Sequence, residues 1–277
     1  MKKSYIIFLI LLLLTTSAFV FKKWNKTPER VAKRVETSVQ KPIVVLTMSY
    51  KNAPFVQRNV DSVLQQKYSN FRWIYIDDAS PDSTFEKVQD LTREFPRIDL
   101  KRNDSNRGAM YNMYSAISSC KPEEIVVVLD GDDWFAHENV LTHVNEYFAN
   151  DDVWLTYGQH IEYPEYKVGL CKPLGNKDPR TSKFLFSHLR CFYAGLFHKI
   201  DKKDLMKDGR FFTASCDVAT MIPMLEMAGK HAYFVRELLH VYNMDNPIGD
   251  AKVRLTSQTS IDQYIRTLPK YKPLEQL

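Results

Sequence analysis

The segment at residues 125–135, IVVVLDGDDWF, constrains this chain more than any other stretch. Its first four residues are β-branched and apolar, which predicts a buried strand. Three carboxylates follow that strand, Asp130, Asp132 and Asp133, grouped around Gly131. Because neighbouring carboxylates repel one another, we expect a divalent cation with oxygen ligands at this point. Ligands of open α/β sheets sit at the carboxyl ends of strands, so the segment predicts a metal-assisted site for a phosphorylated substrate.

Charge is distributed unevenly along the chain. The formal net charge is +5, but residues 1–41 carry nine basic and two acidic side chains, which leaves −2 for the remainder. A slightly acidic body argues against a nucleic-acid-binding surface, so no nucleic-acid partner is expected. The four cysteines show no CxxC spacing, which argues against a zinc site and leaves disulfides open.

The N-terminal segment is apolar. Tyr5 to Phe21 is a 17-residue run interrupted only by three hydroxyl residues. This length suits a single-pass transmembrane anchor over residues 1–21, at the short limit of about 17–25 residues, and a signal peptide cut near Ala18 is the alternative. A basic stalk over 22–41 follows, which places the body on the cytoplasmic side by the positive-inside rule. We therefore expect a membrane-associated protein, with a lumenal or secreted body as the other orientation.

The body alternates between strand and helix patterns. The first half predicts strands over 43–48, 71–76, 98–101 and 125–128, separated by helices over 54–66, 84–95 and 107–119. The second half predicts helices over 139–148, 184–188 and 217–228, strands over 153–157 and 233–241, and a long loop over 158–183. This order implies an α/β fold with a mostly parallel central sheet and helices on both faces. In the stalk, the spacing of Val31, Val35 and Val39 would suit a short amphipathic helix, but a solvated stalk is the favoured interpretation.

Two acidic clusters close strands of this expected sheet. Asp77 and Asp78 follow the second strand, and Asp130, Asp132 and Asp133 follow the fourth. In a parallel sheet both strand ends open on the same edge, so the two clusters are expected to flank one ligand. Helix capping is the structural alternative for Asp78.

Three motifs of the chain resemble those of the family 2 glycosyltransferases of GT-A fold. They are an opening segment with SVLQQ at 62–66 and IDDAS at 76–80, NRG at 106–108, and LDGDDW at 129–134. A weaker match, at 215–229, sits where the family carries an acidic pair followed by a helix. The resemblance covers about residues 43–246. It implies a GT-A domain over 42–250, with a nucleotide-binding half over about 42–135, an acceptor half over about 136–250, and a C-terminal tail over 251–277.

The resemblance also implies roles for individual residues. Asp78 matches the carboxylate that recognises the base of the nucleotide sugar, and Asp132 matches the direct ligand of the cation. Asp130 matches a residue near the ribose and the metal, and Asp217 matches the general base. The other donor-site positions implied are Ser49, Tyr50, Asn106 and Gly108.

The chain departs from the family pattern at three positions. Lys51 follows the tyrosine of the first loop where the family usually has Asn, and Ala79 stands where Gly is frequent. Cys216 precedes Asp217 where the family usually carries Glu. Glu226 is therefore kept as an alternative base. His240 precedes a segment that lies near the active site in the family, which makes it a candidate third metal ligand.

The activity implied is inverting transfer of a sugar from a nucleotide diphosphate donor, most commonly a UDP-sugar. The acceptor would be a hydroxyl of a glycan, glycolipid or protein. A Mn²⁺ or Mg²⁺ ion held by Asp132 and Asp130 would neutralise the leaving diphosphate, and Asp217 would accept the acceptor proton.

Two rival functions are considered. One is a catalytically degenerate GT-A protein that binds or scaffolds, against which the retained Asp78, Asp132 and Asp217 argue. The other is a haloacid-dehalogenase-like phosphohydrolase, which also places Asp-x-Asp after a strand. That class expects Thr or Val two positions after the second Asp, whereas Asp133 and Trp134 follow here.

Overall fold

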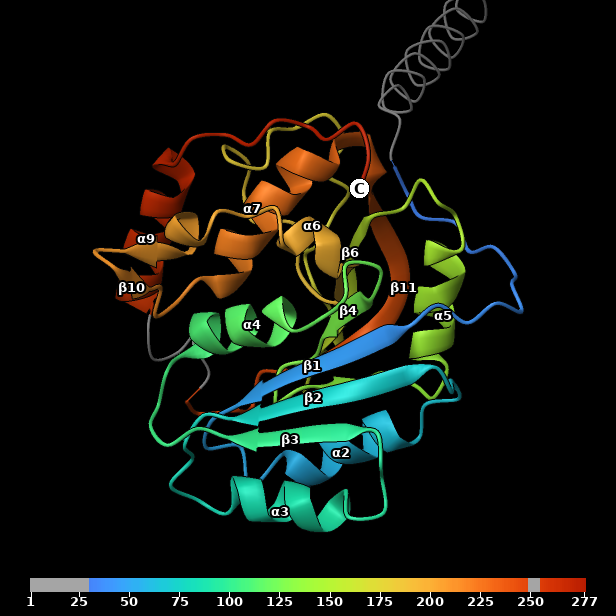
Figure 1. The fold of residues 1–277 in the computed structure, drawn as a ribbon, viewed down its shortest axis with the longest axis vertical. Helices are drawn as coiled ribbons and strands as arrows, with labels where there is room; N and C mark the ends of the chain where they lie inside the picture. Colours follow the sequence, from blue (N-terminus) through green and yellow to red (C-terminus); the bar gives the residue numbers. More distant parts are fainter. Residues whose placement is uncertain (1–29, 249–254) are drawn as a thin grey trace, which may run out of the picture.

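Figure 1 shows the computed structural model, which describes residues 30–248 and 255–277. The anchor expected over 1–21 and the first part of the stalk, up to residue 29, lie outside the described residues. Within the described ranges, the helices are all too short or too polar to cross a membrane.

The first half of the chain builds a parallel sheet with β1 at its centre. The strands are β1 (Ile43–Ser49), β2 (Phe71–Asp77), β3 (Ile98–Arg102) and β4 (Ile125–Val128), connected by α2 (Val56–Leu64), α3 (Thr84–Leu91) and α4 (Ala109–Ser118). β1 pairs in parallel with β2 on one side and with β4 on the other, and every residue of β1 is buried. Strands buried on both faces have continuous apolar runs instead of alternation, which is why IVVL and IVVV identify β1 and β4.

The second half adds strands of both directions to the same sheet. Its elements are β5 (Trp134–Phe135), α5 (Val140–Phe148), β6 (Leu155–Tyr163), β7 (Lys167–Val168), β8 (Arg190–Tyr193), α6 (Ala194–Phe197), β9 (Met206–Lys207), β10 (Arg210–Phe211), α7 (Cys216–Ala228), β11 (Ala232–Asn243) and α9 (Leu255–Thr267), with single 3₁₀ turns at Lys202–Leu205 and Gly229–His231. The sheet order is β3-β2-β1-β4-β8-β6-β11-β5. β8 runs antiparallel to both β4 and β6, while β11 is parallel to β6. The expected mostly parallel sheet is therefore found in the first half, and the complete sheet is mixed.

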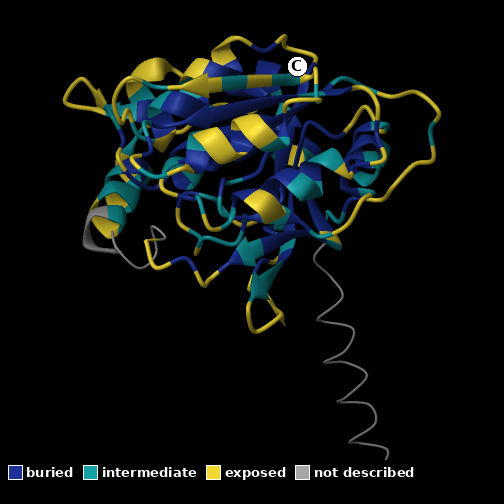
Figure 2. Ribbon diagram, turned by 90° about the horizontal axis from the view of Figure 1, so that it is seen from below, coloured by how far each residue is buried: buried dark blue, intermediate teal, exposed yellow. Residues whose placement is uncertain are grey.

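Helices cover both faces of the sheet and enclose two apolar cores. Helices α4, α6 and α7 pack against one face, where Val44, Leu46 and Ile74 point. Helices α2, α3 and α5 pack against the other face, which receives Val45 and Trp73. Figure 2 shows buried residues concentrated inside this arrangement, with exposed residues on outer helix faces and loops. Alternate residues of β1 thus contribute to different cores, as the strand period of two requires.

Two local predictions are wrong, and one alternative is decided. Residues 30–41 form no helix: Val31 makes a bridge with Phe234, and Val35 and Val39 are exposed, as the favoured solvated stalk requires. Residues 184–188 form no helix; the segment is irregular although Phe186 is fully buried. The loop expected over 158–183 contains most of β6 and the short β7.

The segment expected to be a C-terminal tail contains a helix that contacts the body. α9 packs against α7, and Ile265 on α9 is only 2% exposed and belongs to the core beneath α7. Leu274, further along, donates its backbone N–H to the carbonyl of Met227. Residues 258–277 therefore help to close the acceptor half.

Candidate active site

The two acidic clusters come together at one edge of the sheet. β1 lies between β2 and β4, so the ends of these three strands are adjacent. They carry Asp77 and Asp78 after β2, Ser49 at the end of β1, and the acidic loop 130–133 after β4. Asp77 is used locally, because one of its carboxylate oxygens accepts the backbone N–H of Ser80 at 3.0 Å. The acidic loop supplies the carboxylates of this edge that are considered for a ligand site.

Gly131 allows the acidic loop to lie directly on the loop after β1. Its backbone N–H donates to the carbonyl of Met48 at 3.1 Å. A Cβ atom at this position would lie 2.6 Å from Cβ of Ser49 and 2.8 Å from Nδ2 of Asn52, closer than side chains tolerate. Glycine is the residue that permits such close approach. The glycine between the carboxylates is therefore required by packing, and it fixes where Asp130 and Asp132 lie.

Asp132 lies in an environment that disfavours its negative charge, which a bound cation would stabilise. Burial, followed by the charge of Asp133, raises the pKa of Asp132 to about 8. The side-chain amide of Asn246, which donates to Oδ2 at 2.7 Å, and a backbone hydrogen bond of Asp132 itself offset these effects in part. A hard divalent cation bound here would reverse both unfavourable effects, and oxygen ligands suit Mg²⁺ and Mn²⁺. The residues present therefore fit the expected cation.

Asp130 forms an ion pair with a buried arginine side chain. Nη2 of Arg190, at the start of β8, donates to Oδ2 of Asp130 at 3.0 Å. Arg190 is only 6% exposed, and the charges of Asp130 and then Asp217 raise its pKa against the opposing effect of burial. Arg190 therefore links the acidic loop electrostatically to Asp217. The sequence analysis missed it, since a single arginine opening an apolar strand gives no pattern to detect.

Asp217 lies in the first turn of α7, in the same charge cluster. Its Oδ1 accepts the backbone N–H of Val218 at 2.8 Å, and the preceding Ser215 adopts a left-handed conformation with φ of 56°. Burial raises the pKa of Asp217, and the nearby Arg190 opposes that effect. A carboxylate with a raised pKa beside a guanidinium is suited to accept a proton in a reaction.

Glu226 is not a free carboxylate, so the structure contradicts its use as an alternative base. Its two oxygens accept Nε and Nη2 of Arg180 at 2.6 and 2.9 Å. One of these oxygens also accepts the backbone N–H of Tyr271 at 3.0 Å. A buried, bidentate ion pair of this kind holds segments together and has no lone pair facing a substrate.

Asp78 closes the loop that leads into α4. Its two oxygens accept the backbone N–H groups of Arg107 and Gly108, both at 2.8 Å, and the side-chain amide of Asn103 at 2.6 Å. Asn106 donates from its side chain to the Asp78 carbonyl at 3.3 Å. Gly108 has a φ of +83°, which few other residues adopt. The expected donor residues Asp78, Asn106 and Gly108 are thus in mutual contact, and the Asp78 carboxylate caps this loop in the described state.

Ser49 and Tyr50 occupy the loop between the two acidic clusters. Ser49 is buried and its hydroxyl accepts the side-chain amide of Asn52 at 3.1 Å. Tyr50 is half-buried, with the ammonium of Lys51 at 5.1 Å from its ring centroid. Asn52 is the buried residue of this loop and also contacts Asn246.

The fold and the family follow from comparisons with known proteins. A sequence model described as Glycosyl transferase family 2 matches residues 44–213, well over half of the chain. The mixed α/β sheet with acidic loops at its carboxyl edge fits the GT-A fold. The chain belongs to glycosyl transferase family 2.

Individual relatives agree with this assignment. Glycosyltransferase GlyG of Streptococcus pneumoniae is 26% identical over 220 residues, which are 72% of this chain and 70% of GlyG. Among the curated relatives reported for this chain, the matched share ranges from 34% to 70% of the relative's own length. The activity of the whole chain is therefore treated below as a proposal.

Solved structures share the fold at low sequence identity. The mannosyltransferase PcManGT of Pyrobaculum calidifontis, solved in complex with GDP-Man and Mn²⁺, superposes with a TM-score of 0.59 at 19% identity, covering 82% of this chain and 64% of that chain. TarS of S. aureus, solved as residues 1–349 in complex with UDP-GlcNAc, gives 0.59 at 15% identity, covering 73% and 58%. At these identities the match concerns the fold.

Proposed function

We propose that this protein is a metal-dependent, inverting glycosyltransferase that transfers a sugar from a nucleotide diphosphate donor to a hydroxyl acceptor. The observation that carries the proposal is the half-buried Asp132 carboxylate, which the acidic loop after β4 and the side-chain amide of Asn246 hold at the carboxyl edge of the sheet. A UDP-sugar is the proposed donor, because TarS was solved with UDP-GlcNAc; the GDP-Man held by PcManGT is the competing possibility. A glycan, glycolipid or protein hydroxyl is the proposed acceptor.

The cation is proposed to bind Asp132, with Asp130 as second contact. The Mn²⁺ in the PcManGT complex supports a metal of this kind. When bound, a divalent cation supplies positive charge for the diphosphate leaving group. Asn246 orients the Asp132 carboxylate by its 2.7 Å hydrogen bond, and Arg190 holds Asp130 from the opposite side.

Asp217 is proposed to take the proton from the acceptor hydroxyl. It sits at the start of α7, and the Val218 N–H fixes one of its oxygens, which leaves the other to face the acceptor. Burial raises the pKa of Asp217, and Arg190 opposes that effect by stabilising the charged form of the carboxylate. A positioned base of this type contributes about a hundred- to ten-thousand-fold in rate.

The test is titration of UDP into the full chain, with and without Mn²⁺, beside the variant Asp132→Asn. The expected result is manganese-dependent binding in the wild type that the variant loses. Asp99→Asn, an exposed aspartate on β3, is the matched control and should bind like the wild type. A parallel titration with GDP decides between the two nucleotides. Equal UDP binding by Asp132→Asn, or equal binding in the presence of a chelator, would contradict the proposal.

A further inference from the structure

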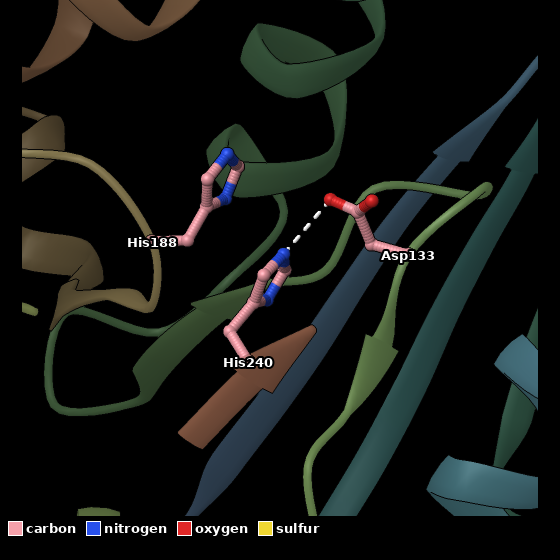
Figure 3. Close-up of side chains that lie close together, drawn as sticks. All are labelled: Asp133, His188 and His240. Carbon is pink, nitrogen blue, oxygen red and sulfur yellow. Dashed lines mark hydrogen bonds and ion pairs between the residues drawn. The ribbon is translucent and has the colours of Figure 1, made fainter. Parts of the chain in front are cut away.

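A second group of potential ligands lies behind the acidic loop. Asp133, His188 and His240 come from three separate segments and each offers one ligand atom, all within 4.8 Å of one another (Figure 3). Asp133 and His240 have no exposed surface, and His188 is 7% exposed. From the sequence, His240 was considered only as a ligand of the donor cation.

Asp133 and Asp132 are consecutive, yet they have different partners. Oδ1 of Asp133 accepts the backbone N–H of Asn243 at 2.8 Å, and Oδ2 lies 2.8 Å from Nε2 of His240. Asp132 instead contacts Asn246. The Asp133 carboxylate is thus committed to the interior, where β11 passes, and the donor cation proposed above does not use it.

The two histidines offer ring nitrogens to the same point as the Asp133 carboxylate, with all three ligand atoms within 4.8 Å of one another. Histidine is the commonest metal-binding side chain. Their rings stack with centroids 4.3 Å apart. Nδ1 of His240 is buried and has no hydrogen-bond partner among the described residues, so Nε2, which faces Asp133, is the ring nitrogen that the ion would use.

Local charge also favours a cation. The acidic loop contributes three carboxylates, and the nearby guanidinium of Arg190 compensates one of them, since it is paired with Asp130 at 3.0 Å. That guanidinium also approaches Nδ1 of His188, at 3.5 Å, and among the described residues it is the positive side chain found against this group.

We propose that Asp133, His188 and His240 form a second metal site, for a transition-metal ion of the Zn²⁺ class. Two imidazoles and one carboxylate suit Zn²⁺, Co²⁺ or Ni²⁺, whereas Mg²⁺ prefers oxygen ligands alone. Tetrahedral ligands of Zn²⁺ lie about 3.3 Å apart, so the 2.8 Å contact between Asp133 and His240 opens by about half an ångström when the ion replaces their shared proton.

The site joins parts of the chain that the donor cation does not reach. Asp133 belongs to the acidic loop, His188 precedes β8, and His240 lies on β11, so an ion ties the donor half to two strands of the acceptor half. Arg190 is two residues beyond His188 and holds Asp130. An ion at this site therefore positions the loop that carries Asp130 and Asp132, without contacting the donor.

The test uses the full chain, stripped with a chelator and free of nucleotide. Titration with Zn²⁺ is followed by calorimetry, and titration with Co²⁺ by the visible absorption of a tetrahedral complex. The expected result is one ion per chain, retained in Asp132→Asn and bound at least about tenfold more weakly in His188→Gln and His240→Gln. Thermal unfolding of each variant checks that it is folded, and Asp133→Asn, which keeps an acceptor for the Asn243 N–H, serves if a histidine variant does not fold.

His160→Gln is the matched control. Its ring packs 5.6 Å from that of His188, and its Nδ1 lies 3.9 Å from Sγ of Cys171, outside the group of three ligands. It should bind Zn²⁺ like the wild type. Absence of stoichiometric binding by the wild type, or binding lost only in His160→Gln or in Asp132→Asn, would overturn the second site. Manganese-dependent UDP binding is measured separately. Failure of the second metal site and failure of the proposed donor site are therefore seen in different experiments.

Discussion

The donor half and the acceptor half of this sheet are held together by different means. In the donor half, parallel strands pair in register, and short side chains such as Asn52 and Asp78 join adjacent loops. In the acceptor half, the irregular segment between β7 and β8 is held by Arg180, which pairs with Glu226 on α7 and donates to the carbonyl of Ile265 on α9. The donor site thus depends on parallel strand pairing and on hydrogen bonds between neighbouring loops. The acceptor region depends instead on a few side-chain pairs between residues far apart in sequence.

The largest effect is expected where the two halves meet, at Asp217. Asp217→Asn preserves shape and the Val218 contact but removes the proton acceptor. We expect the transfer rate to fall by about a hundred- to ten-thousand-fold, with UDP affinity unchanged. Single-turnover transfer and UDP titration on the same preparation measure the two quantities.

The matched control for this variant is Asp208→Asn. Asp208 is exposed and has a φ of 51°, a conformation that asparagine also tolerates. It should transfer at the wild-type rate. Normal turnover by Asp217→Asn would show that Asp217 is not the base. The proposal that the donor half binds the nucleotide while the acceptor half supplies the base would then be wrong.

A second prediction concerns the ion pair that organises the acceptor half. Arg180→Ala leaves Glu226 buried and unpaired, which costs about 3–5 kcal/mol. We expect hydrogen exchange to accelerate in the segment between β7 and β8 and in α9, while β1 and β2 stay protected and UDP still binds. Arg93→Ala removes an exposed ion pair with Asp90 and should cost less than about 1 kcal/mol. Equal loss of protection in β1 would show that the halves unfold as one unit.

The same difference explains how much the sequence could predict. The strands and helices up to β4 were identified because each apolar run is closed by a turn and the βαβ order fixes the connection. The positions of Asp78, Asp132 and Gly131 followed from those strand ends. Beyond β4 the strands pair with partners far away in sequence, so neither the antiparallel β8 nor the docking of α9 leaves a local pattern. Arg190 and the partners of Asp133 were missed for that reason.

The smallest predicted effect is a dependence of stability on pH to which Asp132, in the donor half, contributes. Burial raises the pKa of Asp132 to about 8 in the folded protein, against about 3.9 in an unfolded chain. The protonated carboxyl therefore favours the folded state, fully below the unfolded pKa and progressively less as the pH rises through about 8. Between pH 6.5 and 8 the metal-free protein should lose about 2 kcal/mol of unfolding free energy, measured by urea titration.

In this pH range the effect of Asp132 on stability can be distinguished from that of the buried histidines. His188 and His240 have lowered pKa values, so they reduce stability only as the pH falls below about 6.5. Asp132→Asn should flatten the slope, Asp99→Asn should leave it intact, and saturating Mn²⁺ should reduce it because the ion binds the ionised form. A metal-free wild type with constant stability across this range would mean that Asp132 ionises in the folded loop as readily as in water. The electrostatic cost that the cation is proposed to relieve would then be absent. The acidic loop would no longer differ from the loops of the acceptor half in needing a cation.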